Sequence, residues 1–196
     1  MSNALDGIDS ISTRTKFSYG LGALGKDFAC SIVYLFLMYY YTDVAGVPAA
    51  FVGTLFLVVR MIDAVSDPVM GMIVDNTRSR FGKFRPWIVL GTVINSLALL
   101  ALFSAHLFSG SQLLLFVTVT YIVWGLTYTI MDIPFWSMVP ALSGRREERE
   151  RLVVWPRLFA SIAWTIVGTY GLASIAFLGK GDEGKGFLLF SGLIII

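Results

Sequence analysis

The sequence is poor in the residue types from which disulfides, metal centres and many active sites are built. Its 196 residues include one cysteine, Cys30, and one histidine, His106. A single cysteine excludes an intrachain disulfide, and these two residues provide neither the metal-ligand cluster nor the nucleophile cluster that a membrane-embedded enzyme needs. We therefore predict a protein that is not an enzyme, with no catalytic residue and no cofactor.

Charged side chains are also scarce, at 14% of the chain, whereas 56% of the residues are hydrophobic. This composition excludes an ordinary soluble domain. Uninterrupted apolar runs of about 20 residues, the length that a helix needs to cross roughly 30 Å of hydrocarbon, recur along the chain. We predict an all-α membrane protein whose full spans lie at 17–41, 47–74, 87–108, 113–142 and 152–178.

A sixth apolar run begins at Phe187 and is still apolar at Ile196. A helix over this run rises only about 15 Å, half of a bilayer. We therefore expect a truncated sixth span at 187–196, in the N-terminal part of a longer protein whose missing C-terminal half is its natural partner. The predicted domains are a cytoplasmic tail at 1–16 and a six-helix transmembrane bundle at 17–196.

Lysine and arginine are distributed unevenly between the connectors. They gather in the N-terminal tail and in the connectors DNTRSRFGKFRP and SGRREERE, whereas the opposite connectors contribute only Lys180 and Lys185. Positive charge marks the cytoplasmic side, so we predict a cytoplasmic N-terminus. The net charge of +2 then reflects topology in a lipid bilayer and not nucleic-acid binding. The aromatic run YLFLMYYY, Tyr34 to Tyr41, is predicted to form an interfacial belt on the outer side.

Three charged residues interrupt the second apolar run. Arg60, Asp63 and Asp67 are spaced by three and four residues, which places them on one face of a helix. A charge deep in a bilayer costs several kcal/mol, from roughly 3 upward, so a chain that keeps three on one stripe is expected to use them. Two aspartates four residues apart offer oxygen ligands to a small cation or a proton. Ion-coupled transport is therefore our first hypothesis.

Aspartates in two further predicted spans lie at a depth similar to that of Asp63. Asp27 and Asp132 are placed, like Asp63, about 15–18 Å from the cytoplasmic edge of their helices, near the midplane. Three aspartates from three helices at one depth predict a convergent polar centre, where transporters place their sites. Trp136 follows Asp132 by one helical turn, and a carboxylate beside an aromatic ring suits a sugar. The other ionisable residues within the spans are Lys26 and Arg157.

Structural interpretations of the same residues stay open at this point. Arg60 and Asp63, one turn apart, are compatible with a plain ion pair, and a channel or scaffold whose buried charges are only structural pairs is the alternative function. Arg157 lies a few residues into its helix, from where its guanidinium can also reach the cytoplasmic headgroups. A lone Trp136 is more often a packing residue or an interfacial anchor.

One connector resembles a known family signature. In GMIVDNTRSRFGKFRPW, residues Gly71, Asp75, Arg78, Arg80, Gly82 and Lys83 resemble the helix 2–3 loop of the major facilitator superfamily, in the form found in glycoside–pentoside–hexuronide:cation symporters. The segments SYGLGALGKDFA, LMYYYTDVAG and YTIMDIPFWSMVP agree. The resemblance implies the N-terminal six-helix bundle of a twelve-helix fold in a bacterial inner membrane. The implied function is symport of a sugar, such as the galactoside melibiose, with Na⁺, Li⁺ or H⁺ by alternating access.

The resemblance also implies roles for individual residues. Ser66 stands where the family commonly has an asparagine, and its hydroxyl is shorter and a weaker dipole than an amide carbonyl. This departure argues against sodium and leaves protons and lithium as coupling ions. Asp63 and Asp67 are the carboxylates expected to hold the monovalent cation. The full sets are Lys26, Asp27, Tyr128, Asp132, Trp136 and Arg157 for the sugar, and Asp63, Ser66, Asp67 and Thr129 for the cation.

Overall fold

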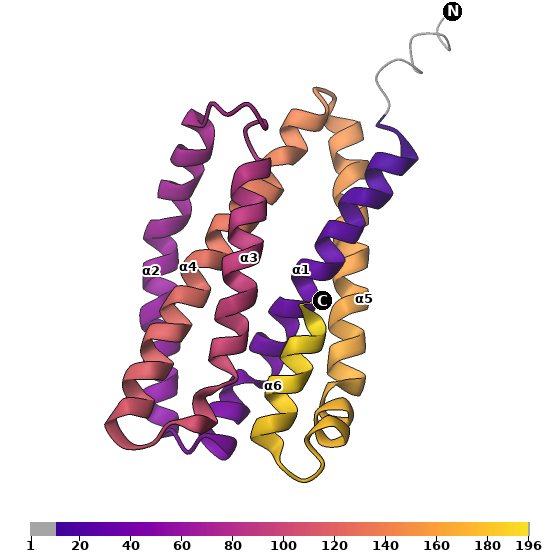
Figure 1. The fold of residues 1–196 in the computed structure, drawn as a ribbon. Coiled ribbons are helices and arrows are strands. Elements are labelled where there is room, and N and C mark those ends of the chain that lie inside the picture. The colour runs from indigo at the N-terminus through magenta and orange to yellow at the C-terminus, as the bar shows by residue number, and fades with distance from the viewer. Residues whose placement is uncertain (1–10, 196) are drawn as a thin grey trace, which may run out of the picture.

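The structure is a computed structural model that describes residues 11–195. Over this range the chain forms six long helices and no strand (Figure 1). A π-helical turn at Tyr40–Val44 continues the first helix, and a short 3₁₀ segment at Ala105–Leu107 follows the third. The helices are α1 Thr13–Tyr39, α2 Ala49–Asn76, α3 Arg85–Leu102, α4 Gly110–Leu142, α5 Arg146–Gly179 and α6 Glu183–Ile194.

Each predicted span overlaps one of these helices, which confirms the all-α fold, but several observed bounds differ from the predicted ones. α1 begins at Thr13, so residues 13–16 of the predicted tail belong to this helix; residues 1–10 lie outside the described residues. α3 ends at Leu102, because a turn and the 3₁₀ segment follow it. α5 begins early, at Arg146, because the charged connector is itself helical and pairs Arg146 with Glu150 at 2.8 Å.

Five helices, α1 to α5, are long and apolar enough to cross a membrane. Their outer faces expose large apolar side chains, among them Met61 at 67%, Val65 at 68% and Phe177 at 81%. Apolar surface on this scale fits contact with lipid and not with water. The chain is therefore a multi-pass membrane protein.

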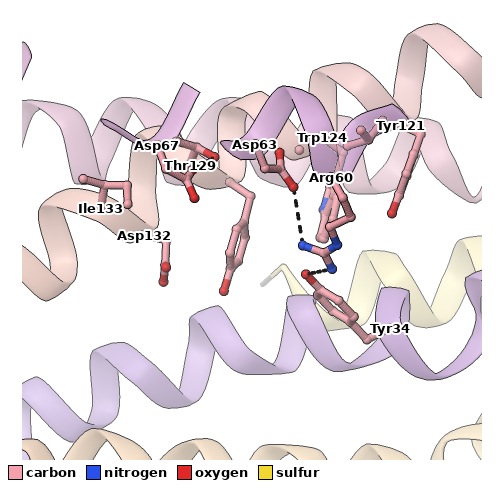
Figure 2. A pocket seen from close by; sticks show the side chains of 12 residues that line it. Tyr34, Arg60, Asp63, Asp67, Tyr121, Trp124, Thr129, Asp132 and Ile133 are labelled. Atoms are coloured by element: carbon pink, nitrogen blue, oxygen red, sulfur yellow. Dashed lines mark hydrogen bonds and ion pairs between the residues drawn. The ribbon is translucent and has the colours of Figure 1, made fainter. Parts of the chain in front are cut away.

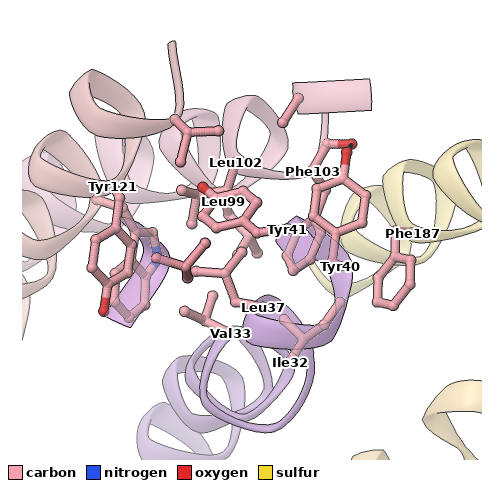
Figure 3. Packing of buried hydrophobic residues seen from close by; sticks show 14 of the residues in the cluster. Ile32, Val33, Leu37, Tyr40, Tyr41, Leu99, Leu102, Phe103, Tyr121 and Phe187 are labelled. Atoms are coloured by element: carbon pink, nitrogen blue, oxygen red, sulfur yellow. Dashed lines mark hydrogen bonds between the residues drawn. The ribbon is translucent and has the colours of Figure 1, made fainter. Parts of the chain in front are cut away.

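Two groups of three helices make up the bundle. α2 and α3 pack against α4, while α1, α5 and α6 pack on one another (Figure 1). At the end of the bundle opposite the N-terminus, a cluster of buried apolar side chains joins the two groups (Figure 3). Its fully buried members include Leu37, Tyr40, Leu99, Phe103 and Phe187, which come from α1, α3, α6 and the turns next to them. We call this cluster the aromatic joint.

Tyr40 and Tyr41 are fully buried in the aromatic joint, so the predicted interfacial belt is wrong at these positions. The Tyr40 hydroxyl donates to the carbonyl of Phe103 at 2.7 Å and lies 2.9 Å from Nδ1 of His106. The Tyr40 ring also lies 5.0 Å, between centroids, from the rings of Phe103 and Phe187. Tyr40 thus combines apolar burial with a satisfied hydroxyl, which is how a buried tyrosine stabilises a core.

A second close contact fixes α4 against α3. The buried Asn95 amide donates to the carbonyl of Trp124 and to Oγ1 of Thr127, both at 3.0 Å. At Gly91 the helices approach so closely that a Cβ would lie 2.8 Å from the backbone nitrogen of Met131. These contacts set the rotation and depth of α4, and α4 carries several of the polar residues described next.

Candidate functional site

The first polar group of the site is built around Lys26 on α1, whose side chain is only 6% exposed. Its ammonium lies 2.6 Å from Oδ1 of Asp132 on α4 and 3.5 Å from Oδ2 of Asp27. It also donates to the hydroxyl of Tyr128 at 3.1 Å and lies 5.8 Å from the ring centroid of Trp136. One lysine therefore brings four of the other predicted sugar-binding residues together, and we call these five residues the lysine group.

The second polar group joins α2 to α4 and contains the predicted cation-binding residues. The Thr129 hydroxyl donates to Oδ1 of Asp67 at 2.9 Å, and Arg60 pairs with Oδ2 of Asp63 at 3.4 Å. Ser66 instead turns back to its own helix, where its hydroxyl donates to the carbonyl of Asp63 at 3.4 Å. Oδ1 of Asp63 is buried and has no hydrogen-bond partner among the described residues. Such an oxygen fits a small cation or a proton, because its lost hydration is otherwise uncompensated.

A cavity of about 250 Å³ connects the two polar groups (Figure 2). Asp132 and Asp67 lie toward one end of it, and Arg60, with the Tyr34 hydroxyl beside it, lies toward the other. Three carboxylates, from Asp63, Asp67 and Asp132, line the cavity. Two cations pair with them, because Arg60 contacts Asp63 and Lys26 contacts Asp132, so the carboxylates still outnumber the cations. This excess of acceptors suits an uncharged, hydroxyl-rich ligand taken together with a cation, because hydroxyls donate to carboxylates and a cation offsets their charge.

Five of the predicted site residues do not line the cavity, namely Lys26, Asp27, Ser66, Trp136 and Arg157. Arg157 is exposed and lines a separate hollow of about 500 Å³, together with arginines from the first turns of α5. Trp136, 36% exposed, contacts the site through Lys26. Sugar binding stays a prediction for all six residues assigned to the sugar, and cation binding stays one for Asp63, Ser66, Asp67 and Thr129. The plain ion pair between Arg60 and Asp63, which was left open as an alternative, does form, and it lines the cavity.

The structure adds site residues that sequence patterns did not single out. Tyr34, which was predicted to lie in the interfacial belt, accepts a hydrogen bond from Nη2 of Arg60. Trp164 on α5 donates its Nε1–H to Oδ1 of Asp27 at 3.2 Å. Trp124 is 4% exposed and lines the cavity, and its Nε1 has no partner among the described residues. The contacts of Tyr34 and Trp164 join different helices, so spacing along one helix carries no signal for them.

Comparison with known proteins places the chain in a family. Residues 18–196 match the family described as MFS/sugar transport protein. The inner membrane symporter YicJ of Escherichia coli (strain K12) is 32% identical over 177 residues, which cover 90% of this chain and 38% of that protein. The isoprimeverose transporter of Lactiplantibacillus pentosus is 35% identical over 171 residues, which cover 85% of this chain and 35% of that protein.

A third relative is the glucuronide carrier protein homolog of Escherichia coli (strain K12). It is 38% identical over 160 residues, which cover 79% of this chain and 34% of that protein. The chain spans less than two-fifths of the length of these three curated relatives. All three are named as a symporter, a transporter or a carrier, and none as an enzyme. The chain therefore belongs to the MFS/sugar transport protein family, among the glycoside–pentoside–hexuronide symporters of the major facilitator superfamily.

Proposed function

We propose that the protein takes part in the symport of a sugar with a cation across a bacterial inner membrane, with its N-terminus in the cytoplasm. The observation that carries the proposal is the cavity in which Asp132, held by Lys26, meets the carboxylates of Asp63 and Asp67. Two of the relatives described above, an inner membrane symporter and an isoprimeverose transporter, support it. Symport makes and breaks no covalent bond, so we assign no residue a catalytic role.

For the sugar we propose a galactoside such as melibiose. Its hydroxyls would donate to the carboxylates of Asp27 and Asp132, and its oxygens would accept from Lys26 and Tyr128. The apolar C–H face of a pyranose would stack on the ring of Trp136. Support comes from the lysine group, which already gathers donors and acceptors within hydrogen-bonding reach of one ammonium.

For the coupling ion we propose H⁺, Li⁺ or Na⁺ at Asp63 and Asp67, with the Thr129 hydroxyl as a further oxygen. Pro68 has no N–H, so the backbone carbonyl one turn before it lacks its helical partner and adds an acceptor near this pair. A bound monovalent cation offsets one of the two negative charges and Arg60 offsets the other, so cation binding stabilises the arrangement that binds the sugar. Reciprocity then requires that the sugar raises the affinity for the cation by the same factor. Alternating access would need a second helical bundle facing this one, which is the partner we propose.

The proposal is tested by sugar binding to the full 196-residue chain in lipid nanodiscs. A panel of p-nitrophenyl glycosides is titrated by saturation-transfer NMR, which detects weak binding, with and without Na⁺ or Li⁺. We expect p-nitrophenyl α-galactoside to bind, and the cation to tighten its binding. A chain that binds no glycoside of the panel under either condition would overturn the proposal.

A channel or scaffold is the second candidate, and one observation favours it. Lys26 and Arg60 are both ion-paired, as purely structural charges would be. In that case no glycoside binds, and replacing Asp132 by asparagine lowers the free energy of unfolding instead. The same nanodisc preparation distinguishes the two, because binding and thermal unfolding are both measured on it.

A further inference from the structure

The carboxylate of Asp27 is held from two sides. Oδ2 lies 3.5 Å from the ammonium of Lys26, the preceding residue on α1. Oδ1 accepts the indole N–H of Trp164 at 3.2 Å, and Trp164 belongs to α5. The Asp27 side chain is 14% exposed, so little water competes with these contacts. Among the described residues, the indole contact thus ties this carboxylate to a second helix.

The two contacts differ in strength. Lys26 lies 2.6 Å from Asp132, a charge-assisted hydrogen bond of short length, but 3.5 Å from Asp27, beyond the usual range for such a bond. The lysine is therefore committed mainly to Asp132. The orientation of the Asp27 carboxylate depends correspondingly more on the Trp164 indole, although that bond is itself at the long end of the usual range.

We propose that Trp164 is a positioning residue for the sugar. Its N–H orients the Asp27 carboxylate so that the remaining lone pairs receive sugar hydroxyls. The inference rests on the proposed function, and it assigns the role to the N–H and not to the bulk of the ring. The ring itself packs near Tyr34, with centroids 5.9 Å apart, and a phenylalanine would retain most of that contact.

The first test is the variant Trp164→Phe in the full 196-residue chain in nanodiscs. The probe is the p-nitrophenyl glycoside that wild type binds most tightly in the panel above. We expect its affinity to fall about tenfold, the size of one lost hydrogen bond to a charged group. Trp155→Phe is the matched control, because Trp155 lies on the same helix and packs on Phe17 and Phe159, away from Asp27. Trp164→His, which keeps a ring N–H, should recover part of the affinity.

The second test asks whether Trp164 acts through Asp27. In an Asp27→Asn background, Trp164→Phe should add no further loss, because the oriented carboxylate is already gone. The indole N–H signal of Trp164, followed by ¹⁵N NMR, should shift on Asp27→Asn and on adding the glycoside. A Trp164→Phe chain that binds like wild type, or losses that multiply in the double variant, would overturn this inference alone. A wild-type chain that binds no glycoside overturns the proposed function, and this inference with it.

Discussion

The apolar aromatic joint around Tyr40 and the polar lysine group around Lys26 both lie inside the bundle, but their polar atoms have different surroundings. In the joint, the Tyr40 hydroxyl donates to the backbone carbonyl of Phe103. The neighbouring Tyr41 hydroxyl has no hydrogen-bond partner among the described residues, but it is fully enclosed by the apolar cluster and does not line the cavity between the two polar groups. In the lysine group, Lys26 is paired with carboxylates that remain partly exposed, with 22% of the Asp132 side chain accessible. Nearby, Oδ1 of Asp63 has no hydrogen-bond partner among the described residues.

This difference separates a region that holds helices together from a region that can bind. A satisfied polar group gains little from a ligand, because it would have to exchange one hydrogen bond for another. An unsatisfied or partly exposed carboxylate gains a donor or a cation. Changes in the aromatic joint should therefore act on stability and leave binding intact, whereas changes in the lysine group and at Asp63 and Asp67 should act on binding and leave stability intact. The predictions below test this separation.

The largest expected effect is a loss of transport when residues 1–196 are expressed alone, because no second helical bundle then covers the polar side chains that line the cavity. Cells that express Met1–Ile196 alone, without another galactoside carrier, should show no uptake of radiolabelled melibiose. The side chain of Arg60 is 53% exposed within a membrane-spanning helix, and such a charge facing lipid costs several kcal/mol. Uptake above that of empty-vector cells would contradict this prediction and indicate a working homodimer.

The next largest effect is a loss of stability, expected where α5 and α6 pack closely against each other. At Gly186 a Cβ would lie 2.3 Å from the backbone carbonyl oxygen of Ile175, so α5 and α6 would have to separate. We expect Gly186→Ala to lower the free energy of unfolding by about 3 kcal/mol, measured by thermal unfolding in detergent.

Gly53→Ala on α2 is the control for that substitution. A Cβ at Gly53 meets no atom within 4 Å, so the added methyl should be neutral or stabilise by up to about 1 kcal/mol. Equal effects of the two substitutions would show that close packing at Gly186 has no energetic role. Glycoside affinity of the folded Gly186→Ala fraction should equal that of wild type.

The carboxylates proposed to bind the sugar should show the opposite pattern, with weaker binding and unchanged stability. Asp27→Asn and Asp132→Asn should each weaken glycoside binding about ten- to a hundredfold, because an amide is a weaker acceptor and a charge-assisted hydrogen bond contributes about 1.5–3 kcal/mol. The measurement is the NMR titration in nanodiscs. Asp75→Asn is the control, since that side chain is 74% exposed and pairs with Lys83 in a connector. Wild-type affinity in both variants would favour the scaffold hypothesis.

The smallest expected effect concerns the cation. Asp67→Cys should abolish the tightening of glycoside binding by Li⁺ or Na⁺ while leaving the affinity measured without cation, because it removes the carboxylate that Thr129 contacts and no group of the lysine group. Asp63→Cys should do the same and also free Arg60 from its partner. Cation stimulation that survives in both single variants would refute the assignment of the cation to this pair.

The sequence alone determined the class of fold and the choice of helices that carry the site. Span lengths follow from the thickness of hydrocarbon, and a helical repeat of 3.6 residues is enough to put Arg60, Asp63 and Asp67 on one face. The same arithmetic placed Asp27 and Asp132 at a common depth, and the structure brings both to Lys26. The sequence was misleading for Tyr40 and Tyr41, which were predicted at the membrane interface but are buried. Aromatic side chains near a helix end suit an interface and a buried core equally well.

Only the tertiary structure decided which side chains meet. Lys26 with Asp132, Thr129 with Asp67 and Trp164 with Asp27 each join two helices, and the same arrangement leaves Arg157 in a separate hollow. Such partners depend on the rotation and depth of each helix relative to its neighbour. These are set by close contacts such as that of Gly91 with α4, and a shift of one residue along a helix turns a side chain by about 100°. Periodicity within one helix contains no information about that relative placement.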